Sequence, residues 1–212
     1  MLYFLELTKE RGFQIREEYS TIKEKQICDA HHLTQVGGSK TKIDGQNETE
    51  RKSIKNASGS STQVHLTTQK SFIQKFNLND DAVQFIRLFC GGPEMNINGK
   101  DRYSIRQIDV QYTNAFAEFL KENTENIVNY IVCNGDDITH VIYNDLKNQK
   151  EYELTYSQIL DRIRHAEWYF LNGGIHLKLN KKTLFHFQRE GKKKPSQRYN
   201  VLWHIHKNLF LV

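Results

Sequence analysis

Two neighbouring segments in the N-terminal third of the chain hold the residues with the clearest chemical potential. Lys42-Ile43-Asp44 supplies a carboxylate, and Ser53-Ile54-Lys55 supplies an ammonium group shortly afterwards. A carboxylate binds a hard divalent cation through oxygen, and such a cation polarises a phosphate and lowers the pKa of a bound water. A lysine beside it orients the nucleophile or neutralises developing charge. The two segments together favour metal-assisted hydrolysis of a phosphodiester.

Paired strands would bring these two segments together. The ranges 40–46 and 50–56 are predicted strands, and a polar turn separates them. Because side chains alternate across a strand, Ser53 and Lys55 share one face. If the two strands pair, Asp44 faces Lys55 across the hairpin.

This arrangement resembles the PD-(D/E)XK nuclease superfamily, which includes many type II restriction endonucleases. The family pattern is an Asp on one strand and an acid-x-Lys on the next, and here Ser53 stands in place of the acid. The resemblance implies that Asp44, Ser53 and Lys55 belong to the catalytic site and that Asp44 binds Mg²⁺. It also requires a second acid. Glu50 is one candidate for catalysis and metal binding, although its opposite strand parity demands a bulge or twist, and Glu17 or Glu18 on the preceding helix is the other.

A second alignment is also possible, with Glu50-Arg51-Lys52 on the acid-x-Lys pattern. Its residue types match the acid-x-Lys pattern better, but polar residues flank it, whereas the family motif lies on a buried strand with apolar flanks. Ser53-Ile54-Lys55 keeps an apolar centre. We therefore prefer Lys55 over Lys52 as the catalytic lysine.

A run of small hydrogen-bonding residues, 56–63, follows Lys55 directly. Such a run can approach a DNA backbone closely and donate amide and hydroxyl groups to phosphate. The alternative interpretation is a flexible turn. The candidate DNA contacts in and just after this run are Ser60, Ser61, Gln63, His65 and Gln69.

The C-terminal segment is the most basic part of a chain whose formal net charge is +5. Residues 185–188 alternate apolar and polar before a lysine-rich loop, and the resemblance implies a basic β-hairpin at about 175–206 that enters a DNA groove. Arginine can pair with guanine and glutamine with adenine, while lysines add affinity for phosphate. A solvated hairpin tip is the alternative. The candidate contacts are Gln188, Arg189, Lys192 and Lys193.

Helical and strand periodicities are mixed along all 212 residues. We predict one α/β domain over 1–212, with a central mixed sheet flanked by helices as in restriction endonucleases and a catalytic core at about 13–90. The predicted helices are 13–33, 69–89 with a break near 77–79, 106–130 and about 157–169. The further predicted strands are 62–67, 138–144, 151–155, 175–179, 183–188 and 198–206.

The remaining chemistry-bearing residues are assigned to the core. Three widely spaced cysteines indicate reduced thiols in a cytoplasmic protein, and no apolar stretch reaches the length of a membrane span. His204 and His206 share a strand face and could chelate zinc, but two ligands do not make a site, so half-buried polar side chains are the favoured interpretation. The sequence contains no glycine-rich phosphate loop, so it does not indicate a nucleotide cofactor.

The resemblance, together with these patterns, implies a type II restriction endonuclease that cleaves double-stranded DNA at a short specific site with Mg²⁺. A symmetric site would call for a homodimer in which each subunit cuts one strand. A non-catalytic DNA-binding module is one alternative, supported by the missing acid at position 53. A structure-specific repair nuclease is another.

Overall fold

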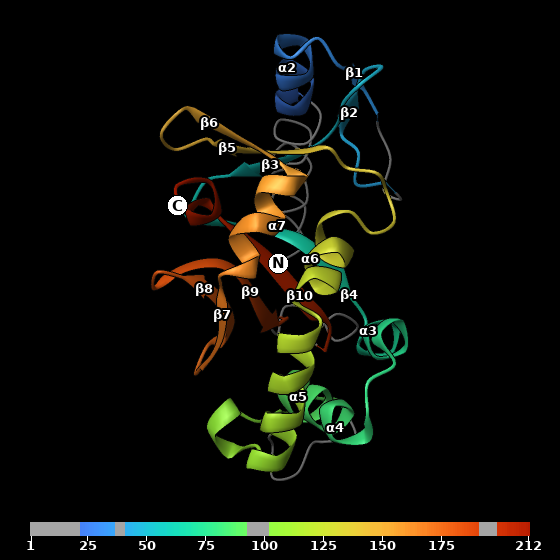
Figure 1. Cartoon of the computed structure of the whole chain (residues 1–212), viewed down its shortest axis with the longest axis vertical. Helices are drawn as coiled ribbons and strands as arrows, with labels where there is room; N and C mark the ends of the chain where they lie inside the picture. The colour runs from blue at the N-terminus through green and yellow to red at the C-terminus, as the bar shows by residue number, and fades with distance from the viewer. Residues whose placement is uncertain (1–21, 37–40, 93–101, 191–198) are drawn as a thin grey trace, which may run out of the picture. The chain divides into compact units, whose positions relative to one another are not determined.

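The computed structural model describes most of the chain, and Figure 1 shows its helices and strands. The described residues are 22–36, 41–92, 102–190 and 199–212. They form six α-helices and ten strands, which confirms the predicted mixed α/β class. Among these residues, no helix is long and apolar enough to cross a membrane.

The chain divides into two compact units by its internal contacts. Unit 1 comprises the described residues of 1–59 and 133–157, and unit 2 comprises those of 60–132 and 158–212. Each unit contains its own five-stranded sheet, where the sequence predicted a single central sheet. One nuclease domain over the whole chain stays a prediction, as does the cytoplasmic location.

Unit 1 contains one described α-helix and five strands. They are α2 (Lys23–Ala30), β1 (Thr34–Gln35), β2 (Gly45–Gln46), β3 (Arg51–Ala57), β5 (His140–Asp145) and β6 (Lys150–Thr155). The strand order is β1-β2-β3-β5-β6. β3 and β5 run parallel, and the other neighbouring strands are antiparallel, so this sheet is mixed.

A small apolar core holds α2 against this sheet. Its members are Ile27, Cys28, Leu33, Ile54 and Ile142. The approach is close at Gly45 of β2, because a Cβ atom there would lie 2.6 Å from Sγ of Cys28. Only glycine leaves room at that position without a shift of the neighbours.

Unit 2 contains an antiparallel sheet with helices, drawn from green to red in Figure 1. Its elements are β4 (Ser61–Thr67), α3 (Gln69–Phe76), α4 (Asp80–Cys90), η3 (Ile105–Gln107), α5 (Val110–Glu122), α6 (Thr124–Val132), α7 (Tyr156–Arg164, beginning in unit 1), β7 (Glu167–Leu171), β8 (Gly174–Leu179), β9 (Lys182–Arg189), β10 (Val201–His206) and η5 (Lys207–Phe210). The strand order is β4-β10-β9-β8-β7.

Aromatic side chains form the core of unit 2. Phe187 of β9 and Trp203 of β10 lie opposite each other, with ring centroids 5.1 Å apart. The rings of Phe85 and Phe116, from α4 and α5, stack at 4.6 Å. Alternation along β9 and β10 sends these aromatic side chains to one face of the sheet and leaves polar side chains on the other.

Local sequence signals explain where several elements begin and end. The predicted break near 77–79 is confirmed, because Asn77 adopts a left-handed conformation after α3 and the side chain of Asn79 accepts a hydrogen bond from Ala82 N at the start of α4. The predicted strands 50–56 and 62–67 and the hairpin at 138–155 are also confirmed.

Three predicted elements differ from the structure. The strand 40–46 is reduced to two residues, because Thr41 Oγ1 and Lys42 N donate to the carboxylate of Asp136 instead of to a neighbouring strand. The helix predicted to reach about 169 ends at Arg164, and β7 follows with alternating half-buried and exposed side chains. The helix 106–130 is divided at Asn123 into α5 and α6. Of the helix predicted at 13–33, the structure describes residues 22–33, and α2 ends at Ala30.

Candidate functional site

Asp44 lies against the middle of β3 in unit 1. Its Oδ2 accepts hydrogen bonds from Ile54 N at 2.6 Å, Ser53 Oγ at 3.3 Å and Lys55 Nζ at 3.3 Å. Its backbone N–H donates to Lys52 O at 2.9 Å, which continues the pairing of β2 with β3. The structure therefore brings Asp44 and Lys55 together in the arrangement that strand alternation predicts.

Lys55 and Asp44 differ in how far they are exposed and in their further hydrogen bonds. The Lys55 side chain is 14% exposed and the Asp44 side chain 21%. Lys55 Nζ also donates to Ile54 O at 3.2 Å, which limits its movement. All side-chain hydrogen bonds to Asp44 from the described residues end on Oδ2, so Oδ1 accepts no hydrogen bond from them. Ser53 is fully buried, so it acts on the site only by holding the Asp44 carboxylate.

Glu24, in the first turn of α2, is a second carboxylate in the electrostatic environment of Asp44, and the sequence analysis did not name it. Burial and the negative charge of Asp44 raise its pKa to about 7, although Lys55 opposes the shift. Glu24 therefore lies close enough to the other two charges to feel both. The sequence could have predicted that Glu24 lies on the buried face of its helix, because Ile27 and Cys28, three and four residues later, are on that face.

Lys42 adds a second cation to the same group of charges. Burial and the positive charge of Lys55 together lower the pKa of Lys42 to about 8, although Asp44 and Asp136 oppose the shift. Its backbone N–H donates to Asp136 Oδ2, which holds the segment before Asp44 in place. The charges of Lys42 and Lys55 thus both act on the carboxylate of Asp44.

The carboxylates fit a magnesium ion better than a transition metal. The described residues contain no group of three His, Cys, Asp or Glu side chains arranged to hold a metal. Magnesium is commonly bound by one or two carboxylates while it keeps several waters, and Asp44 and Glu24 are the two carboxylates that a magnesium ion would find here. A cation would also relieve the repulsion that raises the pKa of Glu24.

Glu50 lies elsewhere, and this corrects its prediction as an acid of the Asp44 site. Its Oε2 is 3.3 Å from Lys52 Nζ, and Lys52 Nζ is also 2.7 Å from Glu153 Oε1. Lys52 and Ile54 share the face of β3 opposite to Ser53 and Lys55, so the carboxylate of Glu50 is held by Lys52 on that face.

Lys52 is buried, at 4% exposure. Burial by itself lowers its pKa, but the hydrogen bonds and charges of Glu153 and Glu50 outweigh burial and raise it. Its Nζ also lies 3.3 Å from Nδ1 of His31. These partners occupy the ammonium group, which supports the preference for Lys55 over the Glu50-Arg51-Lys52 alignment.

Several predicted DNA contacts are engaged inside unit 2. Gln69 Nε2 donates to Gly91 O and Tyr199 O, each at 2.7 Å, and His65 is buried with its ring 4.5 Å from that of Tyr130. Arg189 Nη1 donates to Tyr103 O at 2.8 Å. These three assignments need correction.

The inward position of Arg189 has a simple cause. It shares strand parity with Phe185 and Phe187, which are buried in the aromatic core, and its guanidinium lies 5.4 Å from the ring centroid of Phe89. Of the other predicted contacts, Ser60 and Gln63 are exposed and Ser61 is half-buried, while Gln188 is half-buried with its Oε1 3.0 Å from Nε2 of His186. Glu17, Glu18, Lys192 and Lys193 lie outside the described residues.

Four histidines form a row on the polar face of the antiparallel sheet. His176, His186 and His204 occupy directly paired positions on β8, β9 and β10, and His186 Nδ1 lies 2.6 Å from Nε2 of His206. Burial lowers the pKa of His176 and of His204 to about 4 and that of His206 to about 3. The rings are therefore neutral at pH 7, as half-buried polar side chains.

Comparisons with known proteins say little about the function of this site. No protein-family model matches the chain, and no curated protein matches it. Among solved structures, the chain is similar to restriction endonuclease MspI, crystallised in complex with its cognate DNA, with a TM-score of 0.45 and 10% sequence identity. The alignment covers 81% of this chain and 66% of the endonuclease chain, so the chain spans slightly less than two thirds of that protein. A similarity of this extent assigns neither a site nor an activity.

Proposed function

We propose that this chain is a Mg²⁺-dependent endonuclease that hydrolyses phosphodiester bonds in double-stranded DNA. The observation that carries the proposal is the hydrogen bond of 3.3 Å between Lys55 Nζ and Asp44 Oδ2, beside a second carboxylate on Glu24. Opposite charges held together at a strand suit the hydrolysis of an anionic linkage.

In this proposal Asp44 and Glu24 hold the metal. Asp44 is fixed by Ile54 N and Ser53 Oγ on one oxygen, so its second oxygen faces the ligand with little loss of side-chain freedom. Glu24 replaces the acid that Ser53 leaves missing from the strand pattern. When bound, Mg²⁺ would polarise the scissile phosphate and favour the ionised form of a nearby water.

The two lysines have separate roles. Lys55 is held by Asp44 Oδ2 and Ile54 O, so its ammonium group is positioned to orient an attacking water or to stabilise charge on the phosphate. Lys42 lies among the same charges and adds positive potential that attracts the DNA backbone. Ser53 is a positioning residue, because it reaches only Asp44.

We further propose that cleavage occurs at a short specific site and that the chain acts as a homodimer. A twofold-symmetric DNA site would match a twofold dimer in which each subunit cuts one strand. On the sheet of unit 2, the predicted DNA contact Gln63 is exposed, and the predicted base contact Gln188 is half-buried beside His186. The competing possibility, DNA binding without scission, makes the opposite prediction in a cleavage assay.

A plasmid cleavage assay with Mg²⁺, with and without EDTA, tests the proposed activity. We expect discrete fragments that disappear with chelator. Asp44→Asn and Lys55→Ala should each reduce the cleavage rate by about a hundredfold or more, as the loss of one transition-state contact does elsewhere. Glu48→Gln is the matched control, because Glu48 is exposed in the same unit and should leave cleavage unchanged.

Two results would contradict the proposal. Cleavage by Asp44→Asn at the wild-type rate would remove the metal-site assignment. Retention of DNA on a gel without scission, in Mg²⁺ or in Mn²⁺, would favour the non-catalytic binding module. Circular dichroism of each variant separates loss of activity from loss of fold.

A further inference from the structure

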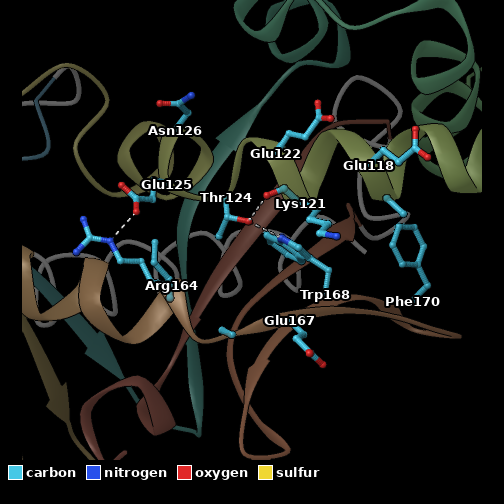
Figure 2. A pocket seen from close by; sticks show the side chains of 13 residues that line it. Glu118, Lys121, Glu122, Thr124, Glu125, Asn126, Arg164, Glu167, Trp168 and Phe170 are labelled. Carbon is cyan, nitrogen blue, oxygen red and sulfur yellow. Dashed lines mark hydrogen bonds and ion pairs between the residues drawn. The ribbon is translucent and has the colours of Figure 1, made fainter.

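A groove runs beside β7 in unit 2, on residues that the proposed nuclease chemistry does not use. It has a volume of about 960 Å³, and its lining comes from the end of α5, the start of α6, the end of α7, and β7. Figure 2 shows Trp168 beside Lys121 and Thr124, with Glu125 and Arg164 at one end of the groove and Phe170 at the other. Glu167, Trp168 and Phe170 of β7 line the groove.

β7 is the last strand of the antiparallel sheet. It pairs with β8 on one side, and no described strand pairs with its other edge. Two of its side chains, Tyr169 and Leu171, are large, apolar and 42% and 39% exposed. A strand edge without a neighbouring strand is a template for one more strand, because its outer N–H and C=O groups have no partner within the sheet.

The floor of the groove is aromatic. Trp168 and Phe170 are half-buried, so each presents part of its ring to a ligand. The indole Nε1 of Trp168 donates to Thr124 Oγ1 at 3.0 Å, which fixes the ring orientation. A preset aromatic surface of this type binds apolar side chains and the faces of cationic groups.

The rim of the groove is acidic. Its charged residues are Glu118, Glu122, Glu125 and Glu167 against Lys121 and Arg164. Arg164 is already paired with Glu125 at 2.8 Å and with Asp161 at 2.9 Å. Glu118 and Glu122 are exposed and form no ion pair with any described residue, so their charge is available to a partner. The sign of this rim repels phosphate and attracts ammonium or guanidinium groups.

We propose that the β7 groove is a docking site for an extended, lysine- or arginine-containing segment of a partner protein. The segment adds to the free edge of β7 through main-chain hydrogen bonds, and its alternate side chains reach the aromatic floor and the acidic rim. Charge complementarity with Glu118 and Glu122 selects a basic segment over DNA. This inference is independent of the proposed nuclease activity.

A peptide array tests the proposal with the full-length chain. An array of synthetic octapeptides of varied sequence is probed with the wild-type protein, and we expect binders in which basic and apolar residues alternate. The tightest binder is then titrated in solution against tryptophan fluorescence. Trp203 is fully buried, so of the two tryptophans Trp168 reports on the groove.

Two matched comparisons separate strand addition from simple charge attraction. Glu122→Lys should weaken binding about tenfold, equivalent to about 1.4 kcal/mol, whereas Glu48→Lys in unit 1 should not change it. The same peptide with alternate backbone nitrogens methylated keeps its charge but loses the main-chain donors. It should bind the wild-type protein at least about tenfold more weakly than the unmethylated peptide does.

Several results would overturn the proposal. An array without basic binders, or equal binding to Glu122→Lys, removes the partner chemistry. Equal binding of the methylated peptide removes strand addition, and displacement of the peptide by spermidine at the same concentration assigns the groove to a small cation. A wild-type dimer that Leu171→Lys converts to monomer would assign the edge to a second copy of this chain.

Discussion

The row of four histidines on the antiparallel sheet should make unit 2 sensitive to acid. Nδ1 of His186 and Nε2 of His206 are 2.6 Å apart, so one nitrogen donates and the other accepts a single shared hydrogen. A second proton would break that bond. The charged residue that affects the row most is Lys178, which is itself a cation. Protonation of the rings is therefore uncompensated in the folded state.

The direction of the effect follows from the pKa values. Burial holds the pKa of His176 and of His204 at about 4 and that of His206 at about 3, below the ordinary value of 6.5. The unfolded chain then binds more protons than the folded chain at every pH between these values and 6.5. Stability is fully present above about pH 7 and falls as the pH drops.

The magnitude can be worked from these three side chains. Each fully uncoupled histidine would contribute a slope of about 1.4 kcal/mol per pH unit, and three would contribute about 4 kcal/mol. The rings are half-exposed and interact with one another, so we expect roughly 2–3 kcal/mol per pH unit below about pH 6. Against a total stability of about 5–15 kcal/mol, a loss of this size per pH unit should begin to unfold unit 2 only near about pH 4.

Urea denaturation at several pH values measures this slope. Tryptophan fluorescence follows unit 2, because both Trp168 and Trp203 belong to it. His206→Gln removes one buried titrating group and should lower the slope by about a third, since it is one of the three that carry it. The exposed His165→Gln is the matched control and should leave it unchanged. A free energy of unfolding that is constant from about pH 7 to about pH 5 would refute the reasoning.

Three further predictions concern unit 1. Mg²⁺ should raise the melting temperature of the wild-type protein, and Glu24→Gln should abolish that rise; an unchanged response of this variant to Mg²⁺ in a thermal melt would contradict the metal assignment. Glu24→Gln should also stabilise the metal-free protein above pH 7, because the raised pKa of Glu24 means that its ionised carboxylate destabilises the folded state. Lys52→Ala should cost about 2–4 kcal/mol in urea denaturation, because it leaves Glu153 and Glu50 without their cation, yet cleavage per folded molecule should persist; greater loss of cleavage than in Lys55→Ala would favour the alternative alignment. Gly45→Ala should cost about 1–3 kcal/mol through contact with Cys28 Sγ, and Cys28→Ala in the same chain should recover part of it; an additive effect of the two changes would show that the contact is not the cause.

The pattern along the chain was sufficient for the local features of the candidate site. Alternation on β3 placed Ser53 and Lys55 on one face, and the short connection to Asp44 placed the carboxylate beside them. Asn79 at the start of α4 was also predictable, because capping depends on neighbours within a few residues. Such features need only strand or helix geometry and short sequence separation.

Long-range packing decided the rest. Glu24 lies in the electrostatic environment of Asp44 because α2 packs on the mixed sheet through Ile54 and Ile142. Glu50 pairs with Lys52 instead, on the opposite face of β3, where Lys52 also binds the distant Glu153. Arg189 turns inward because its strand parity is that of the aromatic core. Periodicity states which side chains share a face, but the partner that covers a face comes from distant segments, and that partner sets the burial and charge on which reactivity depends.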